Sequence, residues 1–332
     1  MTLNRGKVHQ YLGMTIDFST PGKVIFSMFD YVQNMLDALP VDMSGEAVTP
    51  ASLFLFDTNN DAKKLDEEVA IMFHHNTAKL LFLCKRARPD LQTAVAFLCT
   101  RVKMPDVDDY KKLCRVMRYL RATKQMPLTL EADSTNVIKW WVDAAYAIHA
   151  DMRSHTGGAM SMGKGVMYGT STRQKLSTKS STEAEIVAVS DVLPQVVRTR
   201  YFLEAQGYIM SDYIEYQDNQ SAILLEKHGK ASSSKRTRHI NIRYFFVCDR
   251  IHNKELSVAY CPTLRMLADY FTKPLQGSQF QILRNRIMNY NPDQQSAQDY
   301  RSVLDGHRDH TSTHDHDHTS THEKTCAGDL DG

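Results

Sequence analysis

The chain has 332 residues, of which 42% are hydrophobic, and a formal net charge of +2. This length suffices for one large domain or two ordinary ones, and the low charge excludes a uniformly basic nucleic-acid-binding protein. The six cysteines are scattered without a CxxC pair, which argues against zinc fingers and a disulfide framework. The polar start "MTLNRGKVHQ" and the short apolar runs predict a soluble intracellular protein without membrane contact.

Residues 1–126 are predicted to form a first part. The opening alternates apolar and polar residues around "STPGK", which predicts two strands joined by a turn, and an amphipathic helix follows. After a polar loop, two further helices are expected over 67–87 and 109–124. The last of these helices carries basic residues that could follow a nucleic-acid duplex, although a solvated helix face is the simpler interpretation. These residues are Lys111, Lys112, Arg115, Arg118 and Arg121.

Residues 127–290 are predicted to form an α/β domain, in which helices flank a mixed sheet. Branched and aromatic residues over 137–147 favour a strand, and "GKG" favours a hairpin turn within 157–174. The remaining elements are expected as a helix over 181–207, a strand over 212–219, helices over 220–229 and 236–253, a strand over 255–262 and a last helix over 264–273.

Residues 291–332 are predicted to be a disordered tail rich in histidine and aspartate. The segment has almost no large apolar residues, and "HDHTSTH" nearly repeats "RDHTSTH". Such a composition cannot bury enough surface to offset the entropy of ordering. Its histidines could bind transition metals loosely, although a solvated tail without a metal role is the simpler interpretation.

Glu183 and Glu185 lie near the start of the predicted helix over 181–207. Because a helix turns about 100° per residue, their side chains point to different sides. Glu185 is in phase with an apolar stripe and Glu183 with polar residues. The stripe comprises Ala188, Val189, Val192 and Val196, and the polar residues are Ser190 and Asp191. A carboxylate beside an apolar stripe must be paired, hydrogen-bonded or metal-bound, so Glu185 is the candidate for chemistry.

Three further acids occupy comparable places. Asp143 lies inside or at the end of a strand, Asp218 ends another strand, and Asp269 lies in the last predicted helix. Each one alone could be an ordinary turn or cap residue. Ligands usually converge at strand ends in open α/β sheets, so the four acids together predict a site.

The blocks "SSTEAE", "DNQSA", "RTRHINIRYFF" and "ADYFTKPL" follow one another in the second part. They resemble the ribonuclease H domain of copia-type LTR retrotransposon polyproteins. In the first part, "HQYLGMTID" is similar to the end of a reverse-transcriptase palm, and "LLFLCKRARPDLQTAVAFL" and "YKKLCRVMRYLRATKQMPLTL" are similar to the thumb and connection. The resemblance implies a ribonuclease H-like mixed five-stranded sheet over 127–290, preceded by a partial palm, thumb and connection.

This resemblance implies metal-dependent hydrolysis of the RNA strand of RNA–DNA hybrids. Two Mg²⁺ ions about 3.5–4 Å apart would assist it, and Mn²⁺ could substitute. Carboxylates without cysteine or histidine are suitable ligands for Mg²⁺. Asp143 would bridge the two ions, Glu185 and Asp218 would hold one of them, and Asp269 would hold the other.

A local basic cluster, "KASSSKRTRH", follows the helix after Asp218. Its cations could neutralise backbone phosphates, although a solvated loop is an alternative. His239 shares a helix face with Arg243 and is also a candidate for assisting product release. The predicted nucleic-acid-binding residues are Lys235, Arg236, Arg238, His239 and Arg243.

A Tyr-x-Asp-Asp turn, which a reverse transcriptase needs, is missing from the sequence. It is expected upstream of residue 1, so polymerase activity by this chain alone is not expected, and the upstream polymerase part is a possible partner. A cytoplasmic location is expected, within a virus-like particle if the full element is active. The alternative is a catalytically idle nucleic-acid-binding remnant. An integrase would need an Asp-Asp-Glu order, which the chain lacks.

Overall fold

The computed structural model describes residues 5–133, 135–228 and 238–291. No helix within these ranges is both long enough and apolar enough to cross a membrane. The predicted disordered tail lies outside the described residues, apart from Asn291.

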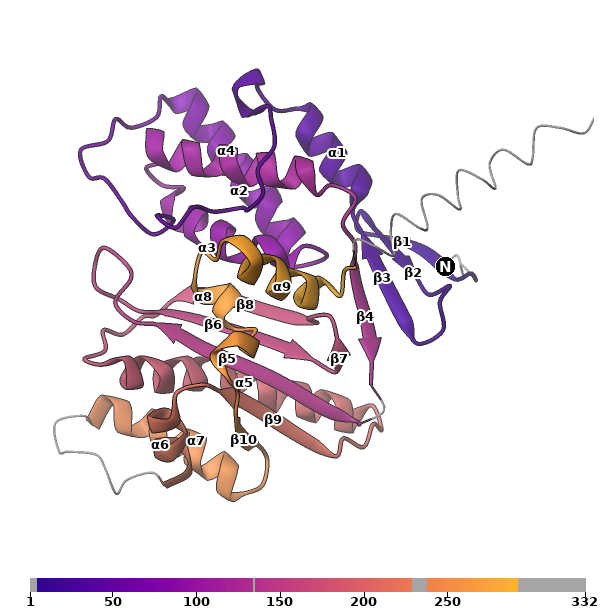
Figure 1. Ribbon diagram of the computed structural model, residues 1–332, viewed down its shortest axis with the longest axis vertical. Coiled ribbons are helices and arrows are strands. Elements are labelled where there is room, and N and C mark those ends of the chain that lie inside the picture. Colours follow the sequence, from indigo (N-terminus) through magenta and orange to yellow (C-terminus); the bar gives the residue numbers. More distant parts are fainter. Residues whose placement is uncertain (1–4, 134, 229–237, 292–332) are drawn as a thin grey trace, which may run out of the picture. The chain divides into compact units, whose positions relative to one another are not determined.

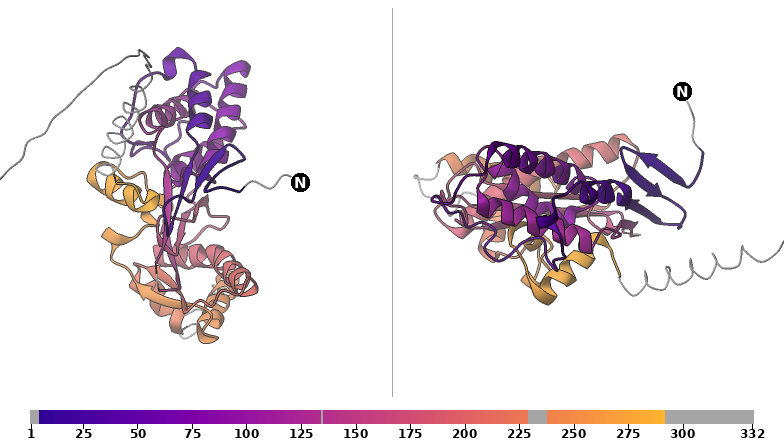
Figure 2. Two further views of the ribbon diagram at one scale, coloured as in Figure 1. Left: turned by 90° about the vertical axis from the view of Figure 1, so that its right-hand side faces the viewer. Right: turned by 90° about the horizontal axis from the view of Figure 1, so that it is seen from above.

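A first sheet combines strands from both predicted parts of the chain (Figure 1). Its strands β1 to β3 form an antiparallel meander that projects to one side in Figure 2. The predicted turn at "STPGK" joins β2 to β3, whereas the turn at Leu12 and Gly13, which separates β1 from β2, was not predicted. β4 then pairs with β3 and with β7, so this sheet continues past residue 126. The strands are β1 (Val8–Tyr11), β2 (Met14–Asp17), β3 (Lys23–Ser27), β4 (Leu128–Ala132) and β7 (Gly163–Lys164).

Four α-helices follow β3 and precede β4 along the chain, and their apolar faces share one core. They are α1 (Phe29–Asp37), α2 (Glu67–Cys84), α3 (Gln92–Arg101) and α4 (Val107–Ala122). Short 3₁₀ turns lie at Val41–Met43 (η1) and Pro89–Leu91 (η2). Pro89 disfavours helical backbone at the residue before it, which fits the end of α2 before η2.

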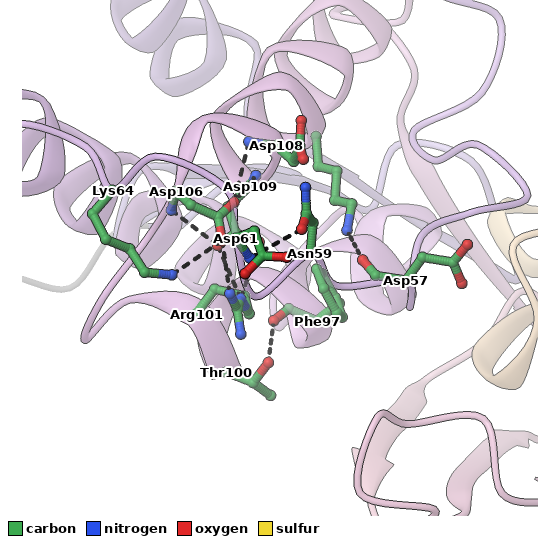
Figure 3. Close-up of polar contacts among 11 residues, drawn as sticks. Asp57, Asn59, Asp61, Lys64, Phe97, Thr100, Arg101, Asp106, Asp108 and Asp109 are labelled. Atoms are coloured by element: carbon green, nitrogen blue, oxygen red, sulfur yellow. Dashed lines mark hydrogen bonds and ion pairs between the residues drawn. The ribbon is translucent and has the colours of Figure 1, made fainter.

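The start of α4 is fixed by a network of charged side chains (Figure 3). Asp106 accepts from the backbone N–H groups of Asp108 and Asp109, while Asp109 accepts from the backbone of Asp106, which is a capping box. Arg101 binds both acids, and Lys64 Nζ lies 3.3 Å from Asp106. The network joins the loop before α2 to α4.

Basic residues further along α4 bind the end of η1 and the loop that follows it. Arg115 donates to the carbonyl oxygen of Thr49, Arg118 to that of Ser44, and Arg121 to that of Met43. These guanidinium groups are therefore engaged with the protein, and the expected duplex-tracking helix face is smaller than the sequence indicates.

A second sheet has the order β10-β9-β5-β6-β8. β9 is parallel to both β10 and β5, whereas β6 is antiparallel to both β5 and β8. The predicted mixed five-stranded sheet flanked by helices is confirmed. Its strands are β5 (Val137–Ala145), β6 (His155–Ser161), β8 (Tyr168–Arg173), β9 (Asp212–Gln217) and β10 (Ser257–Tyr260).

Alternate residues of β5 point to opposite faces of this sheet. Ile138, Trp140 and Val142 share a core with α5, whereas Trp141 belongs to the core on the side of α8. α6 and α7 pack beside α5, and α8 contacts β5, β6 and β8 (Figure 1). The helices are α5 (Ser181–Ala205), α6 (Gln220–His228), α7 (Arg238–His252), α8 (Asp269–Thr272) and α9 (Gly277–Met288).

The end of the domain differs from the expectation of one helix over 264–273. A 3₁₀ turn, η4 (Thr263–Arg265), is followed by the extended residue Met266, whose ψ is 101°, and α8 is only four residues long. α9 was not predicted. Tertiary packing decides this path, because Met266 and Phe271 are fully buried.

Candidate active site

Three acids from separate elements meet at one end of the second sheet. Asp143 lies on β5, Asp218 directly follows β9, and Asp269 is the first residue of α8. Each offers a carboxylate oxygen within 4.8 Å of the other two. Asp143 and Asp269 are buried, whereas Asp218 is half-buried. The sequence order therefore predicted a set of acids that the fold does bring together.

Glu185 lies beside this group on the first turns of α5. It is buried, as are Ala188, Val189 and Val192 of the predicted stripe, so the helix phase inferred from the sequence is correct. Its Oε2 accepts a hydrogen bond of 3.3 Å from Gln217 Nε2. Glu183 is half-buried and instead accepts from the backbone N–H of Lys179, ahead of the helix.

Gln217, which the sequence analysis did not single out, holds two of the acids in place. Its side chain is fully buried, and its Oε1 accepts from the backbone N–H groups of Asp218 and Asn219 at 2.9 and 3.0 Å. One amide thus orients Glu185 and fixes the turn that carries Asp218. Its position next to Asp218 was the available signal.

Two glycines form the seat of α8. A Cβ on Gly157, which faces Asp143 across the β5–β6 ladder, would lie 2.8 Å from the carbonyl oxygen of Ala268. A Cβ on Gly169 would lie 2.8 Å from the Phe271 ring. Because glycine has no side chain, α8 can approach the sheet closely enough to bring Asp269 beside Asp143.

Three residues near Asp269 in the sequence, one before it and two after it, also reach into the cluster. Thr272 Oγ1 donates to Asp143 Oδ2 in a short hydrogen bond, and Thr263 Oγ1 donates to Asp218 Oδ2 at 3.1 Å. Lys273 Nζ lies 2.7 Å from Asp269 Oδ1 and 3.5 Å from Asp143 Oδ2. The sequence analysis missed these three residues, since only the tertiary structure places them near Asp143 and Asp218.

Burial, and after it the charges of neighbouring carboxylates, raise the pKa values of Glu185, Asp218 and Asp269. Burial raises the pKa of Asp269 to about 7, with a further contribution from the charge of Asp143. Burial and the charges of Asp143 and Asp218 raise the pKa of Glu185 well above its usual range. Burial lowers the pKa of Lys273, but the neighbouring carboxylates outweigh it and the net shift is upward. The cluster therefore favours any cation that enters it.

The donor set fits a hard divalent cation. The converging ligand atoms are carboxylate oxygens, which Mg²⁺ and Mn²⁺ prefer, and they come from different elements of a rigid scaffold. Among the described residues, the ammonium group of Lys273 is the cation that contacts these carboxyl groups, and one ammonium does not compensate four carboxyl groups.

The predicted nucleic-acid-binding residues are only partly described. Lys235 and Arg236 lie outside the described residues, and Arg238 and His239 begin α7 with side chains that are also outside them. Arg243 is described, and its Nη1 lies 2.5 Å from Asp191 Oδ1 on α5. Its guanidinium is therefore already paired with the protein.

Sequence comparison finds no matching family model. The chain is 26% identical over 288 residues to the Retrovirus-related Pol polyprotein from transposon TNT 1-94 of Nicotiana tabacum, which covers 85% of this chain and 22% of that protein. It is 31% identical over 202 residues to the Retrovirus-related Pol polyprotein from transposon RE2 of Arabidopsis thaliana, over 60% of this chain and 14% of that protein. The chain thus spans a small fraction of these relatives, and the predicted kinship with copia-type retrotransposon polyproteins is confirmed.

Among solved structures, LC11-RNase H1 from compost matches with 13% identity and a TM-score of 0.32, over 41% of this chain and 92% of that one. The same enzyme in complex with an RNA/DNA hybrid matches with a TM-score of 0.30, over 40% of this chain and 92% of that one.

Proposed function

We propose that this relative of retrotransposon Pol polyproteins is a divalent-metal-dependent nuclease that cleaves the RNA strand of RNA–DNA hybrids. The convergence of Asp143, Asp218 and Asp269, with Glu185 beside them, is the observation that supports the proposal most strongly. The nuclease class fits the kinship with Pol polyproteins. The choice of an RNA–DNA hybrid comes from the resemblance seen in the sequence.

Asp143 would bridge two Mg²⁺ ions, Glu185 and Asp218 would hold one of them, and Asp269 would hold the other, with Mn²⁺ as a substitute. When bound, such ions polarise the phosphoryl group and lower the pKa of an attacking water. The carboxylates must therefore be ionised and correctly oriented when substrate arrives.

The protein's own side chains provide that orientation. Gln217 fixes Glu185 and the turn at Asp218, and Thr272 fixes one oxygen of Asp143. Because these supports are buried, the carboxylates keep one arrangement without solvent competing for their hydrogen bonds. The scaffold thus preorganises the acids for metal and substrate.

The basic residues Lys235, Arg236, Arg238 and His239 would contact backbone phosphates of the hybrid. Arg243 would join them only by exchanging its contact with Asp191 for a phosphate. A polymerase part of a Pol polyprotein would be a partner, in the cytoplasm or, if the full element is active, within a virus-like particle. Exposed apolar side chains on and beside β1 and β2 fit such a contact: Val8, Tyr11, Leu12 and Phe18.

The decisive experiment is cleavage of a hybrid with labelled RNA by the full chain. We expect RNA fragments in Mg²⁺ and none in EDTA. Asp143→Asn should abolish cleavage, whereas the matched control Asp151→Asn, which changes a half-exposed acid outside the cluster, should not. Hybrid binding without cleavage by folded protein, in Mg²⁺ and in Mn²⁺, would contradict the proposal and favour the idle remnant.

A further inference from the structure

Lys273 places its ammonium group among the oxygens of the carboxylate cluster. Its Nζ lies 2.7 Å from Asp269 Oδ1 and 3.5 Å from Asp143 Oδ2, so one cation bridges two of the proposed metal ligands. Asp143 Oδ2 also accepts from Thr272. A divalent ion on Asp143 and Asp269 would need the space and the charge that Lys273 now provides.

The backbone at Lys273 is held firmly. Its N–H donates to the carbonyl oxygen of Asp269 at 2.9 Å. Within α8, Tyr270 is fixed on both sides, because its hydroxyl donates to the carbonyl oxygen of Asp90 and its own carbonyl accepts from Thr93 Oγ1 at 2.6 Å. The ammonium therefore cannot leave the cluster through a shift of α8, which is anchored to η2 and α3.

The side chain of Lys273 can leave the cluster by itself. It is 41% exposed, whereas those of its two acidic partners are 4% and 8% exposed. Lysine carries a compact charge on a flexible stem of four carbons, so rotation toward solvent needs no movement of the backbone. The acids are fixed and their counterion is movable.

We propose that Lys273 is a resident cation of the metal-free site: its ammonium neutralises Asp143 and Asp269 until a divalent ion displaces it into solvent. The inference rests on the proposed metal site. An ammonium and a divalent cation repel each other at the same oxygens, so the two states exclude each other. Metal affinity is then set by competition with Lys273, and the ammonium reduces the cost of unpaired buried charge in the metal-free cluster.

Lys64 offers a matched control. Its side chain is 43% exposed, and its Nζ lies 3.3 Å from Oδ2 of the buried Asp106. Lys64 belongs to the charged network at the start of α4 and not to the carboxylate cluster (Figure 3). Lys273→Met and Lys64→Met therefore remove similar half-exposed lysines from buried acids, and only the former should change metal binding.

The first test is calorimetric titration of the full chain with Mn²⁺. We expect Lys273→Met to bind Mn²⁺ about fivefold more tightly or better, the effect of removing one nearby like charge, with Lys64→Met unchanged. In EDTA, Lys273→Met should unfold at a lower temperature than the unaltered chain, and saturating Mn²⁺ should remove the difference. Equal or weaker Mn²⁺ affinity in folded Lys273→Met would overturn the inference.

A second measurement needs no variant. Labelling of the unaltered chain with an amine-reactive reagent, read by mass spectrometry, should increase several-fold at Lys273 when Mn²⁺ is added and should not change at Lys64. Constant labelling at Lys273, while Mn²⁺ binds in a manner that Asp143→Asn abolishes, would refute the resident cation and leave the metal site standing. Absence of Mn²⁺ binding would refute both.

Discussion

Two buried groups of charged side chains in the protein have their charges compensated differently. One is the pair Arg88 and Asp90 in the first part of the chain, and the other is the group of acids around Asp143 in the second. Arg88 and Asp90 form a bidentate ion pair with N–O distances of 2.7 and 2.8 Å. In the part of the chain that the structure describes, the second group has one ammonium for four carboxyl groups.

The Arg88–Asp90 pair is satisfied on nearly every side. Arg88 also donates to the carbonyl oxygen and the hydroxyl of Thr123, and Asp90 accepts from the Tyr119 hydroxyl. Such saturation holds η2, α4 and α8 together, since Tyr270 binds the backbone of Asp90. A cation or a phosphate would find no free ligand there.

The comparison shows which buried charges hold the fold and which are available for chemistry. A neutral pair with all its hydrogen bonds made has nothing to offer a ligand. A group with excess negative charge and a movable counterion stays in the fold at a cost in stability, and that cost is recovered when a cation binds. The predictions below test this distinction.

The largest effect on stability is expected for Arg88→Met. Removing one partner leaves Asp90 buried and unpaired, which costs about 3–5 kcal/mol in the free energy of unfolding. Urea unfolding followed by circular dichroism measures it. Arg153→Met, which removes a half-exposed pair with Asp151, should cost about 1 kcal/mol or less. Equal losses in the two variants would show that the buried pair is not a structural anchor.

The next effect separates the neighbouring glutamates. Glu185→Gln should lower hybrid cleavage by about 100-fold or more, since even an outer partner of a metal ligand is worth 10–100-fold. Its stability should change little, because burial and two nearby acids already raise the pKa of Glu185 and favour its neutral form.

Glu183→Gln is the matched variant. Glu183 accepts from the backbone ahead of α5, so its loss should cost about 0.3–1 kcal/mol of stability and leave cleavage almost unchanged. Cleavage rates and urea midpoints of both variants decide the matter. An inactive Glu183→Gln with an active Glu185→Gln would contradict the proposed ligand set.

A smaller effect is expected for Gly157→Ala. The added Cβ would lie 2.8 Å from the carbonyl oxygen of Ala268, so α8 must move away from the sheet. Overpacking of this kind costs about 1–3 kcal/mol, and the displacement of Asp269 should weaken Mn²⁺ binding as well. Ala159→Gly, two residues along the same strand, is the control that tests whether any change in β6 is enough to weaken Mn²⁺ binding. Mn²⁺ binding at the original affinity would show that α8 does not depend on this seat.

The choice of Glu185 and the placing of Asp218 could be predicted because they depend on local geometry. Helix phase and strand ends are properties of a short stretch of sequence, and the burial of Ala188 and Val189 bears out the phase. The five-stranded sheet followed from the alternation of strands and helices together with the resemblance.

The path around Asp269 could not be predicted, because it depends on contacts between distant residues. α8 is short and separate from η4, and it packs closely on the sheet because Gly157 and Gly169 have no side chains there. Gly157 lies more than 100 positions before α8 in the sequence. Lys273 and Thr272 act on Asp143 for the same reason. Likewise, nothing local reveals that the arginines of α4 bind carbonyl oxygens of a loop rather than phosphates.

The smallest effect concerns a third arrangement, in which buried groups are kept uncharged. His149 Nε2 lies 3.0 Å from His155 Nδ1, and His155 Nε2 lies 2.7 Å from Ser171 Oγ. Both rings also pack against Phe56. Burial lowers the pKa of His155 to about 3, with a contribution from His149, and burial lowers that of His149 to about 4.

Because these folded-state pKa values lie below the unfolded value of about 6.5, the unfolded chain binds more protons in between. The stability that the neutral pair contributes is therefore complete above about pH 6.5 and is lost as the pH falls toward 4. We expect the free energy of unfolding, from urea titrations at a series of pH values, to decline over this range. His155→Gln should reduce the slope, while His74→Gln, which alters an exposed ring, should not. If His155→Gln left the slope unchanged, the acid sensitivity would come from other groups. The histidine pair would then contribute no more to the free energy of unfolding than an ordinary polar contact.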